Sequence, residues 1–382
     1  MNVVIACRTY FPEIGGAASC VEDIAQALSQ AGHCVTVVAS LPSPSIARRE
    51  ERRGIQVVRL EYPPQDLGSM RNILLGITRS FRLLLALARI IRQQHADVVC
   101  LGLVGVDSFF VALLTYVWKI RLVVHLHGSE IRSYVKISPL VRWALRRCLR
   151  QCQASVAVSE DLRRETIAFC PAAREKIHVI PNGVDGEGIR REPPYRRLRP
   201  YLLYVGRLHP VKGVEILIRA FSRAAEQLQE VDLLIVGDGP EQTRLQELVS
   251  RSGMAQRIEF VGRCSRSQAF ALLNGCEYVV APSLLEGCPL VVLEALAAGK
   301  AVIGSRTTGI RDLIAESETG FLFEPGDVSA LALLMVRCHE DRALRERVEA
   351  NIRHRAKMIP ESFQAFLGQH LNLLVACGTS SR

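Results

Sequence analysis

Short apolar runs rich in β-branched residues recur along the chain and limit its fold more than any other feature. They are residues 2–7, 34–40, 55–60, 97–102, 121–128 and 154–160, then 201–206, 231–237, 257–262, 277–283, 301–305 and 320–325. Stretches with helical periodicity, such as residues 20–32, separate most of them. Apolar strands that alternate with helices are typical of a parallel sheet covered on both faces. We therefore predict the α/β class, with two tandem doubly wound Rossmann-like domains.

The boundary between the domains is predicted from a stretch rich in Gly, Pro and Arg at residues 181–200. A chain of 382 residues is also long for a single core. We expect an N-terminal domain over 1–185, a C-terminal domain over 186–360, a cleft between them, and a last helix over 361–382. Ligands of such sheets bind beyond the carboxyl ends of the strands, so functional residues are expected in the loops there.

Cysteine usage and the apolar segments bear on the compartment. Twelve cysteines are scattered from Cys7 to Cys377 without a C-x-x-C pair, which favours reduced, mostly buried thiols and a cytoplasmic protein. The N-terminus has the pattern of a first strand and not of a signal peptide. The longest apolar run, residues 101–118, is interrupted by Asp107 and is short for a membrane span, so a buried helix is expected.

The net charge of +10 lies mainly in the first half, where residues 1–190 contain 24 Lys and Arg against 16 Asp and Glu. Such a bias favours an anionic partner. The helical stretches 77–94 and 139–151 concentrate this charge, and the first places its arginines on one face: Arg79, Arg82, Arg89 and Arg92. Two interpretations stay open. The faces are ordinary solvated surfaces, or they contact an anionic membrane leaflet and give access to a lipid-linked acceptor.

The stretch 285–305 carries two carboxylates around a Gly-Cys-Pro turn. Glu286 is predicted in the loop after strand 277–283, and Pro289 fits the first turn of the helix that follows. The free N–H groups at the start of that helix suit a phosphate. Glu294, one turn further on, is placed to bind the hydroxyls of a nucleotide ribose, and Glu286 is placed to meet another polyol.

Other strand ends carry weaker signals. Arg207 and Lys212 are two cations near a helix start, as a diphosphate leaving group requires, although both fit solvated loop charges equally well taken alone. Gly15 and Gly16 allow either a close approach of backbone to a ligand or a tight turn. His127 ends a strand and suits a functional or a structural role.

Several motifs are absent from the sequence. It contains no D-x-D, H-E-x-x-H, Walker A or G-x-S-x-G pattern. Residues 235–241 offer only a G-x-G after a strand, so nicotinamide binding is poorly supported.

Together, these pieces resemble the retaining GT-B glycosyltransferases of family 4. The residues and motifs that carry the resemblance run from the first strand to about residue 330: Gly15-Gly16, 127-HGSE-130, 180-IPNGVD-185, 205-VGRLHPVKG-213, 236-VGDGP-240, and Glu286 with Glu294. Three positions depart from the usual pattern of the family. Glu130 replaces an Asp, Arg311-Asp312 replaces Pro-Glu, and Cys288 replaces an aromatic residue.

The resemblance implies a role for each matching residue. Glu294 would bind the ribose and Glu286 the donor sugar, while His127 would lie beside that sugar. Arg207 and Lys212 would hold the diphosphate. Further contacts would come from the amides around Gly287, Cys288 and Leu290, and from Gly15 and Gly16 of the opposite domain. His127, Glu286, Arg207 and Lys212 form the implied catalytic set, and neither a metal nor a cofactor is expected. The last helix is expected to cross back onto the first domain.

The implied function is a retaining, metal-independent glycosyltransferase of class EC 2.4. It would move a sugar from a nucleotide-diphosphate sugar to a hydroxyl acceptor in the synthesis of cell-envelope polysaccharide, lipopolysaccharide or glycolipid. The expected partners are the donor, a glycan or lipid-linked acceptor and an anionic inner membrane face, but no nucleic acid. A nucleotide-sugar epimerase and a non-catalytic sugar-nucleotide-binding protein of the same architecture are the alternatives.

Overall fold

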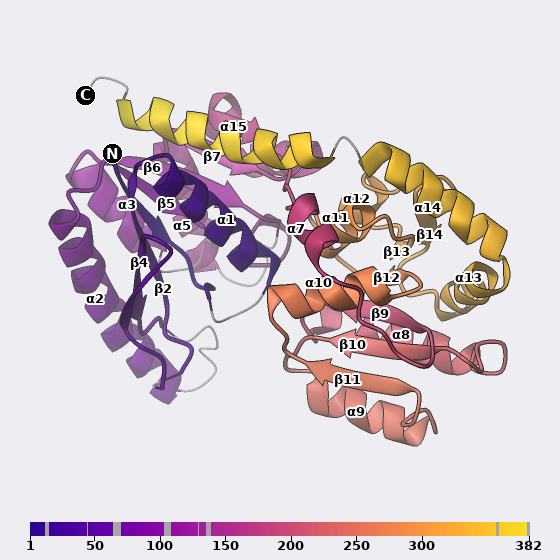
Figure 1. Cartoon of the computed structure of the whole chain (residues 1–382). Coiled ribbons are helices and arrows are strands. Elements are labelled where there is room, and N and C mark those ends of the chain that lie inside the picture. The colour runs from indigo at the N-terminus through magenta and orange to yellow at the C-terminus, as the bar shows by residue number, and fades with distance from the viewer. Residues whose placement is uncertain are drawn as a thin grey trace. The chain divides into compact units, whose positions relative to one another are not determined.

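The computed structural model describes residues 1–11, 15–43, 45–63, 70–102, 108–128, 130–134, 139–356 and 359–379. Its contacts divide the chain into two compact units (Figure 1). Unit 1 comprises Met1–Pro181 together with Phe366–Arg382, and unit 2 comprises Asn182–Ala365. The end of the chain therefore belongs to the same unit as its beginning.

The described strands of unit 1 form an eight-stranded sheet in the order β3-β4-β2-β1-β5-β6-β7-β8. Their bounds are β1 Asn2–Ala6, β2 Cys34–Ser40, β3 Arg49–Arg52, β4 Ile55–Leu60, β5 Val98–Leu101, β6 Arg121–Leu126, β7 Ala154–Ala157 and β8 Ile177–Val179. Every neighbouring pair is parallel except the antiparallel pair of β3 and β4. The six predicted strands of this half are confirmed. The charged β3 and the three-residue β8 were not predicted, because neither contains an apolar run.

The helices of unit 1 are α1 Gly16–Gln30, α2 Met70–Gln93, α3 Ser108–Val117, α5 Pro139–Gln151, α6 Glu160–Phe169 and α15 Ile359–Thr379, with the short turns η1 Glu130–Tyr134 and η2 Pro171–Lys176. Asp107 lies outside the described residues, but α3 buries Val111, Ala112 and Leu114, as expected of a helix in an α/β domain. Within the described part of the chain, no helix is both long and apolar enough to cross a bilayer.

Helix α15 changes unit part-way along its length, because its residues from Phe366 onward belong to unit 1. Arg121 at the start of β6 donates a hydrogen bond to the carbonyl of Gly378 at 2.9 Å. The ring of His370 stacks on that of His125 in β6, with centroids 5.2 Å apart. The C-terminal segment thus covers β6, the strand that leads to His127.

Unit 2 has a six-stranded parallel sheet in the order β11-β10-β9-β12-β13-β14. Its strands are β9 Tyr201–Val205, β10 Asp232–Val236, β11 Ile258–Gly262, β12 Val279–Ala281, β13 Val302–Ser305 and β14 Gly320–Phe323, which confirms the six predicted strands of this half. Its helical elements are α7 Gly186–Arg191, η3 Pro210–Lys212, α8 Val214–Arg223, α9 Gln242–Arg251, α10 Arg266–Gly275, α11 Leu290–Ala297, α12 Thr308–Arg311, α13 Val328–Glu340 and α14 Arg342–Ala356.

The core of unit 2 lies on both faces of this sheet. Leu202 and Leu233 belong to one buried cluster, whereas their neighbours Leu203 and Leu234 belong to another. Successive strand residues point to opposite faces, so both faces are covered and the strands are apolar throughout. This arrangement explains why the strands were recognisable in the sequence.

The cysteines behave as the sequence predicts. All twelve are free thiols, and eight of them are buried. Burial raises the pKa of several of them, including Cys152 and Cys276, each to about 12. These thiols are therefore protonated at neutral pH and act as small apolar side chains.

Candidate functional site

The loop after β9 carries Arg207 and Lys212. Tyr204 is buried, and its hydroxyl donates to the carbonyl of Arg207 at 2.9 Å, which fixes the start of the loop. The side chain of Arg207 is exposed. The loop ends at Gly213, whose φ of 65° favours glycine and where a Cβ would collide with the carbonyl of Pro282. The loop after β9 is therefore packed directly against the loop after β12.

Lys212 and Glu286 meet across these two loops. The Nζ of Lys212 lies 2.5 Å from Oε1 of Glu286, and the hydroxyl of Ser283 donates to the same oxygen at 2.9 Å. The carboxylate is largely buried, with 11% of the side chain exposed, compared with 28% for Lys212. Burial, and to a smaller extent the charge of Glu286, raises the pKa of Tyr204, which places this phenol close to the pair.

The support of Glu286 continues into the sheet. Ser283 is buried, and its carbonyl accepts a hydrogen bond from the hydroxyl of the fully buried Ser305 at the end of β13. Beyond β13, Gly309 lies so close to the carbonyl of Gly287 that a Cβ would overlap it. Loops from three adjacent strands, β9, β12 and β13, therefore fix the position of one carboxylate.

The turn 287–289 leads into α11. Pro289 is the residue before the helix and not part of its first turn, which corrects the prediction, because its ψ of 119° is extended. Asn182 donates from Nδ2 to the carbonyl of Cys288 at 3.0 Å and so holds this turn in place. Burial raises the pKa of the Cys288 thiol to about 11, so the thiol is neutral. Glu294 lies half-buried on α11, one turn after Leu290.

Unit 1 carries the other predicted residues at the same edge of its sheet. The ring of His127, after β6, bonds to the backbone of Gly102, whose own N–H donates to the carbonyl of Ala6 at the end of β1. Burial lowers the pKa of His127 to about 4, so the imidazole is neutral at pH 7. Gly15 immediately precedes α1, which begins at Gly16.

Gly15 is not explained by packing. Its φ of 168° is extended backbone open to any residue, and a Cβ built there meets no described atom within 4 Å. The described neighbours therefore do not require glycine at this position. The open space leaves room for the close approach of a ligand.

The structure thus brings together Arg207, Lys212, Glu286, Gly287, Cys288, Leu290 and Glu294 at the carboxyl edge of the sheet in unit 2. Gly15, Gly16 and His127 lie in unit 1. Four supporting residues were not predicted: Asn182, Tyr204, Ser283 and Ser305. Asn182 falls within the quoted motif 180–185, which was a usable signal. The hydroxyl residues act through contacts between strands that sequence spacing does not show.

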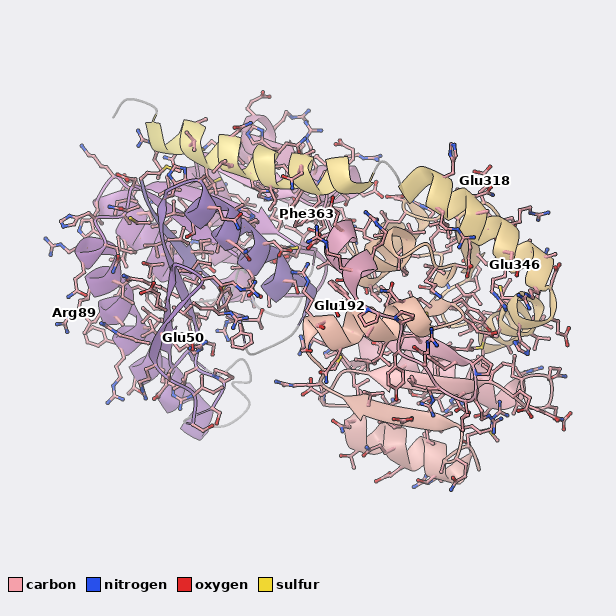
Figure 2. All side chains as sticks on the ribbon, viewed as in Figure 1. Glu50, Arg89, Glu192, Glu318, Glu346 and Phe363 are labelled. Carbon is pink, nitrogen blue, oxygen red and sulfur yellow. The ribbon has the colours of Figure 1, made fainter. Side chains whose placement is uncertain are left out.

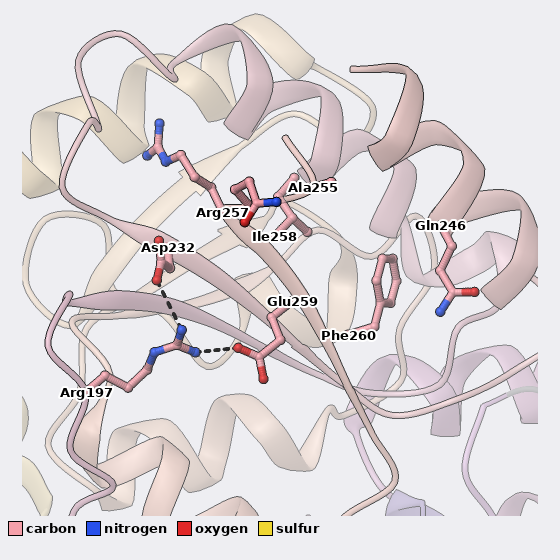
Figure 3. Close-up of a pocket in the computed structure, with 9 residues that line it drawn as sticks. Arg197, Asp232, Gln246, Ala255, Arg257, Ile258, Glu259 and Phe260 are labelled. Carbon is pink, nitrogen blue, oxygen red and sulfur yellow. Dashed lines mark hydrogen bonds and ion pairs between the residues drawn. The ribbon is translucent and has the colours of Figure 1, made fainter. Parts of the chain in front are cut away.

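A pocket in unit 2 lies elsewhere, at the starts of β10 and β11 (Figure 3). Its cation Arg197 is bound by Asp232 at 3.2 Å and Glu259 at 2.7 Å. None of the predicted site residues lines it. Because this pocket lies at the amino ends of the strands, it does not correspond to the predicted donor site.

Among the residues that the structure describes, no group of three or more His, Cys, Asp or Glu side chains is arranged to hold a metal ion.

Comparison with known proteins supplies the family. The model of the glycosyl transferases group 1 matches residues 187–355, and that of glycosyltransferase family 4 matches residues 14–187. The N-acetyl-alpha-D-glucosaminyl L-malate synthase of Bacillus anthracis is 25% identical over 353 residues, which cover 88% of this chain and 87% of the relative.

Two solved structures share the fold. Sucrose-phosphate synthase from Thermosynechococcus elongatus aligns with a TM-score of 0.78 and 20% identity, covering 98% of this chain and all of the other. Anabaena HepE in complex with UDP-glucose gives the same TM-score, identity and coverage. The two family models together extend from residue 14 to residue 355 and meet at the junction of the two units. The chain therefore belongs to the GT-B glycosyltransferases of family 4, and it is a glycosyltransferase that uses nucleotide-sugar donors.

Proposed function

We propose that the enzyme transfers a sugar, with retention of configuration and without a metal ion, from a nucleoside-diphosphate sugar to a hydroxyl acceptor. The observation that carries this proposal is the contact between Lys212 and Glu286. A cation suited to a diphosphate and a carboxylate suited to sugar hydroxyls come from different loops and meet at 2.5 Å, just before α11. HepE, of the same fold, is known in complex with UDP-glucose.

Each site residue has a role in this proposal. Glu294 accepts hydrogen bonds from the ribose hydroxyls, and Glu286 accepts them from the donor sugar. The amides of Gly287, Cys288 and Leu290 contact the diphosphate. The open space at Gly15 allows the backbone of Gly15 and Gly16 to approach the phosphates. His127 lies beside the sugar, with a neutral ring that can exchange hydrogen bonds with a hydroxyl.

In the reaction, the bond between the anomeric carbon and the phosphate oxygen breaks, and the acceptor oxygen forms the new bond on the same face of the sugar. The acceptor proton leaves with the departing phosphate. Negative charge therefore grows on the diphosphate, where Arg207 and Lys212 are the available cations. These two side chains supply the charge that a divalent metal supplies in other transferases, and the sequence has no D-x-D motif to bind one.

The acceptor side is proposed to be a membrane surface. Helices α2, α3 and α5 pack side by side: Arg92 of α2 lies over the ring of Trp118, just after α3, and Arg147 of α5 lies over that of Tyr116. These helices expose large apolar side chains and several arginines. We call these two sets of residues together the apolar–basic face. Its members are Phe81, Leu85, Leu113, Tyr116, Val117, Leu140 and Trp143, with Arg82, Arg89, Arg92, Arg142, Arg146 and Arg150.

Exposed aromatic and aliphatic side chains among arginines fit the interface of an anionic bilayer, where the rings enter the headgroup layer and the guanidinium groups pair with phosphates. Figure 2 shows Arg89 projecting from α2 away from the sheet. We place the enzyme on the cytoplasmic face of the membrane, because its twelve free thiols suit a reducing compartment. A glycan or lipid-linked acceptor of cell-envelope synthesis would be reached there.

The donor is tested by a thermal-shift screen of the purified protein against UDP, GDP and ADP sugars, with and without EDTA. A rise in melting temperature with one of them, unchanged by EDTA, supports a metal-free donor site. Glu294→Gln should remove most of that shift, and the anomeric configuration of the transferred sugar is then read by NMR. Absence of a shift with every donor, or a shift that EDTA abolishes, contradicts the proposal.

The membrane contact is tested by co-sedimentation with vesicles of neutral lipid and with vesicles that contain anionic lipid. We expect binding to the anionic vesicles, and its loss when Leu140 and Trp143 are changed to Ser. Two double variants with the same change in net charge distinguish an effect of this face from an effect of net charge. Arg142→Glu with Arg146→Glu should abolish binding to the anionic vesicles, whereas Arg251→Glu with Arg342→Glu in unit 2 should not. Equal binding to both kinds of vesicle contradicts this part of the proposal.

A further inference from the structure

The turn after β6 is organised around a buried acid, Glu130. No part of this residue is exposed to solvent. Its Oε2 accepts hydrogen bonds from the backbone N–H of His127 at 3.1 Å and of Gly128 at 2.9 Å. Two successive amides can point at one oxygen because Gly128 has a φ of 109°, which other residues rarely adopt. The carboxylate therefore fixes the main chain on both sides of the His127–Gly128 peptide.

The imidazole of His127 is fixed separately. Its ring bonds to the backbone of Gly102, while its Nε2 is buried and has no partner among the described residues. The bonded nitrogen is therefore Nδ1, and because a carbonyl only accepts, Nδ1 carries the proton. Nε2 is then left with a lone pair. A ring held in this way has one acceptor atom, Nε2, and its direction depends on the backbone of the His127–Gly128 turn.

The second carboxylate oxygen of Glu130, Oε1, is also buried and lacks a partner among the residues described. A glutamine in this position can still turn its carbonyl oxygen toward the two N–H groups, with its NH₂ in the place of Oε1. Burial raises the pKa of Glu130 to about 7, and the backbone N–H groups oppose that rise.

We propose that Glu130 is a positioning residue, which holds the His127–Gly128 turn through two backbone hydrogen bonds and thereby sets the direction of the His127 Nε2 toward the reacting sugar. This inference rests on the proposed glycosyl transfer for its effect on rate. The geometric part, that Glu130 orients His127, stands on the contacts of unit 1 alone.

The kinetic test compares Glu130→Ala, Glu130→Gln and wild type in the release of nucleoside diphosphate from the donor found in the screen, with water as acceptor. Glu130→Ala removes the shared acceptor atom, and we expect kcat to fall by about 10- to 100-fold, as for a misplaced catalytic group. The KM for the donor should change less than about threefold, because Glu130 is not among the residues proposed to contact the nucleotide. Glu130→Gln still presents a carbonyl oxygen and should retain kcat within about fivefold.

A matched control uses Glu160, an exposed carboxylate of the same unit that pairs with Arg163. Glu160→Ala should leave kcat and KM unchanged. Circular dichroism and thermal melting confirm that each variant is folded. A folded Glu130→Ala enzyme with wild-type kcat overturns the proposal. Equally low kcat for Glu130→Ala and Glu130→Gln also overturns it, because the charge and not the hydrogen-bonded geometry would then matter.

A second measurement needs no activity. NMR of protein labelled with ¹⁵N-histidine reports the tautomer of each ring, and a His127→Gln variant assigns the His127 signals. We expect the neutral Nδ1–H form of His127 in wild type and in Glu130→Gln, and averaged or shifted signals in Glu130→Ala. Unchanged His127 signals in Glu130→Ala overturn the positioning role. If wild type turns over no donor, the proposed function fails while this result still decides the role of Glu130.

Discussion

The two units hold their predicted site residues in opposite ways. In unit 2, Glu286 is held by other side chains, the cation of Lys212 and the hydroxyl of Ser283. In unit 1, His127 is held by backbone, through the carbonyl of Gly102 and through amides gathered by Glu130. The first arrangement consists of full charges and is partly exposed, whereas in the second Glu130 is fully buried and the partly buried imidazole of His127 is neutral.

This difference predicts how the site residues of each unit respond to substitution and to pH. A charged, partly exposed site depends on individual side chains, so single substitutions should alter catalysis with little effect on folding. A buried site built from titratable groups depends on their protonation, so pH should alter its stability.

The largest effect is expected from Lys212→Ala. It removes a cation from the place where charge grows on the leaving diphosphate, so turnover should fall by an amount equivalent to about 2–4 kcal/mol of transition-state stabilisation. The measurement is the steady-state release of nucleoside diphosphate. Arg251→Ala, at an exposed position of the same unit, is the control and should have no effect. Wild-type turnover in Lys212→Ala would remove this residue from the site.

The next effect is acid destabilisation that is larger in unit 1 than in unit 2. Burial lowers the pKa of His370 to about 4, and His125 and His127 are lowered as well. An unfolded histidine binds its proton near pH 6.5, so stability is complete above that pH and is lost as the pH falls toward 4. The lowered pKa of His370 alone should reduce the free energy of unfolding by about 2 kcal/mol at pH 5. Hydrogen exchange, corrected for its intrinsic pH dependence, should show opening of residues 121–126 and 366–378 but not of 201–205.

Glu130 acts in the opposite direction and provides the control. Its raised pKa of about 7 favours the folded state below pH 4.3 and is unfavourable once the pH rises through 7. The expected loss of stability in acid is therefore a balance of the two contributions, and Glu130→Gln should make this loss steeper. His370→Phe keeps an aromatic ring against His125 but cannot be protonated, so it should make the loss shallower. Equal acid sensitivity of the two units would show that the buried histidines do not control it.

A smaller effect is expected from Ser283→Ala. The variant removes the hydroxyl that donates to Glu286, and a hydrogen bond to a charged group contributes about 1.5–3 kcal/mol at most. Because Lys212 still holds the carboxylate, we expect kcat to fall about 10- to 30-fold, near the low end of that range. Ser222→Ala removes a helix-surface hydroxyl of the same unit and should leave kcat unchanged. Equal kinetics for the two variants would mean that Ser283 does not orient Glu286.

The strands were predicted correctly from the sequence where both of their faces are buried. The strands of unit 2 are apolar on both faces, so each run was visible, and Glu286 and Lys212 could be placed because both follow such strands. β3 has the sequence Arg-Glu-Glu-Arg and is defined by its pairing with β4, which no local pattern shows. Position relative to a strand end was therefore predictable, whereas partners from a distant part of the chain were not.

The supporting contacts illustrate the same limit. Ser305 lies 22 residues from Ser283, and Asn182 lies 106 residues from Cys288. The order of the strands in the sheet determines which of these residues meet. The order β9-β12-β13 cannot be predicted from the spacing of any motif. Pro289 was misplaced by one residue because the extended backbone before α11 is fixed by these same contacts and not by proline alone.

The smallest effect is expected from Asn182→Ala, which tests whether the turn before α11 is held by this residue from a distant part of the chain. Alanine cannot donate to the carbonyl of Cys288 and adds no charge beside the site, so the loss should be about 0.5–1.5 kcal/mol, the range for one neutral hydrogen bond. Because the carbonyl belongs to the turn whose amides are proposed to contact the diphosphate, the loss should appear as a few-fold rise in the donor KM with little change in kcat. Isothermal titration with the donor measures the same change directly. A fall in kcat with KM unchanged would instead place Asn182 among the groups that act in the transition state, and the turn would then be more than a binding element.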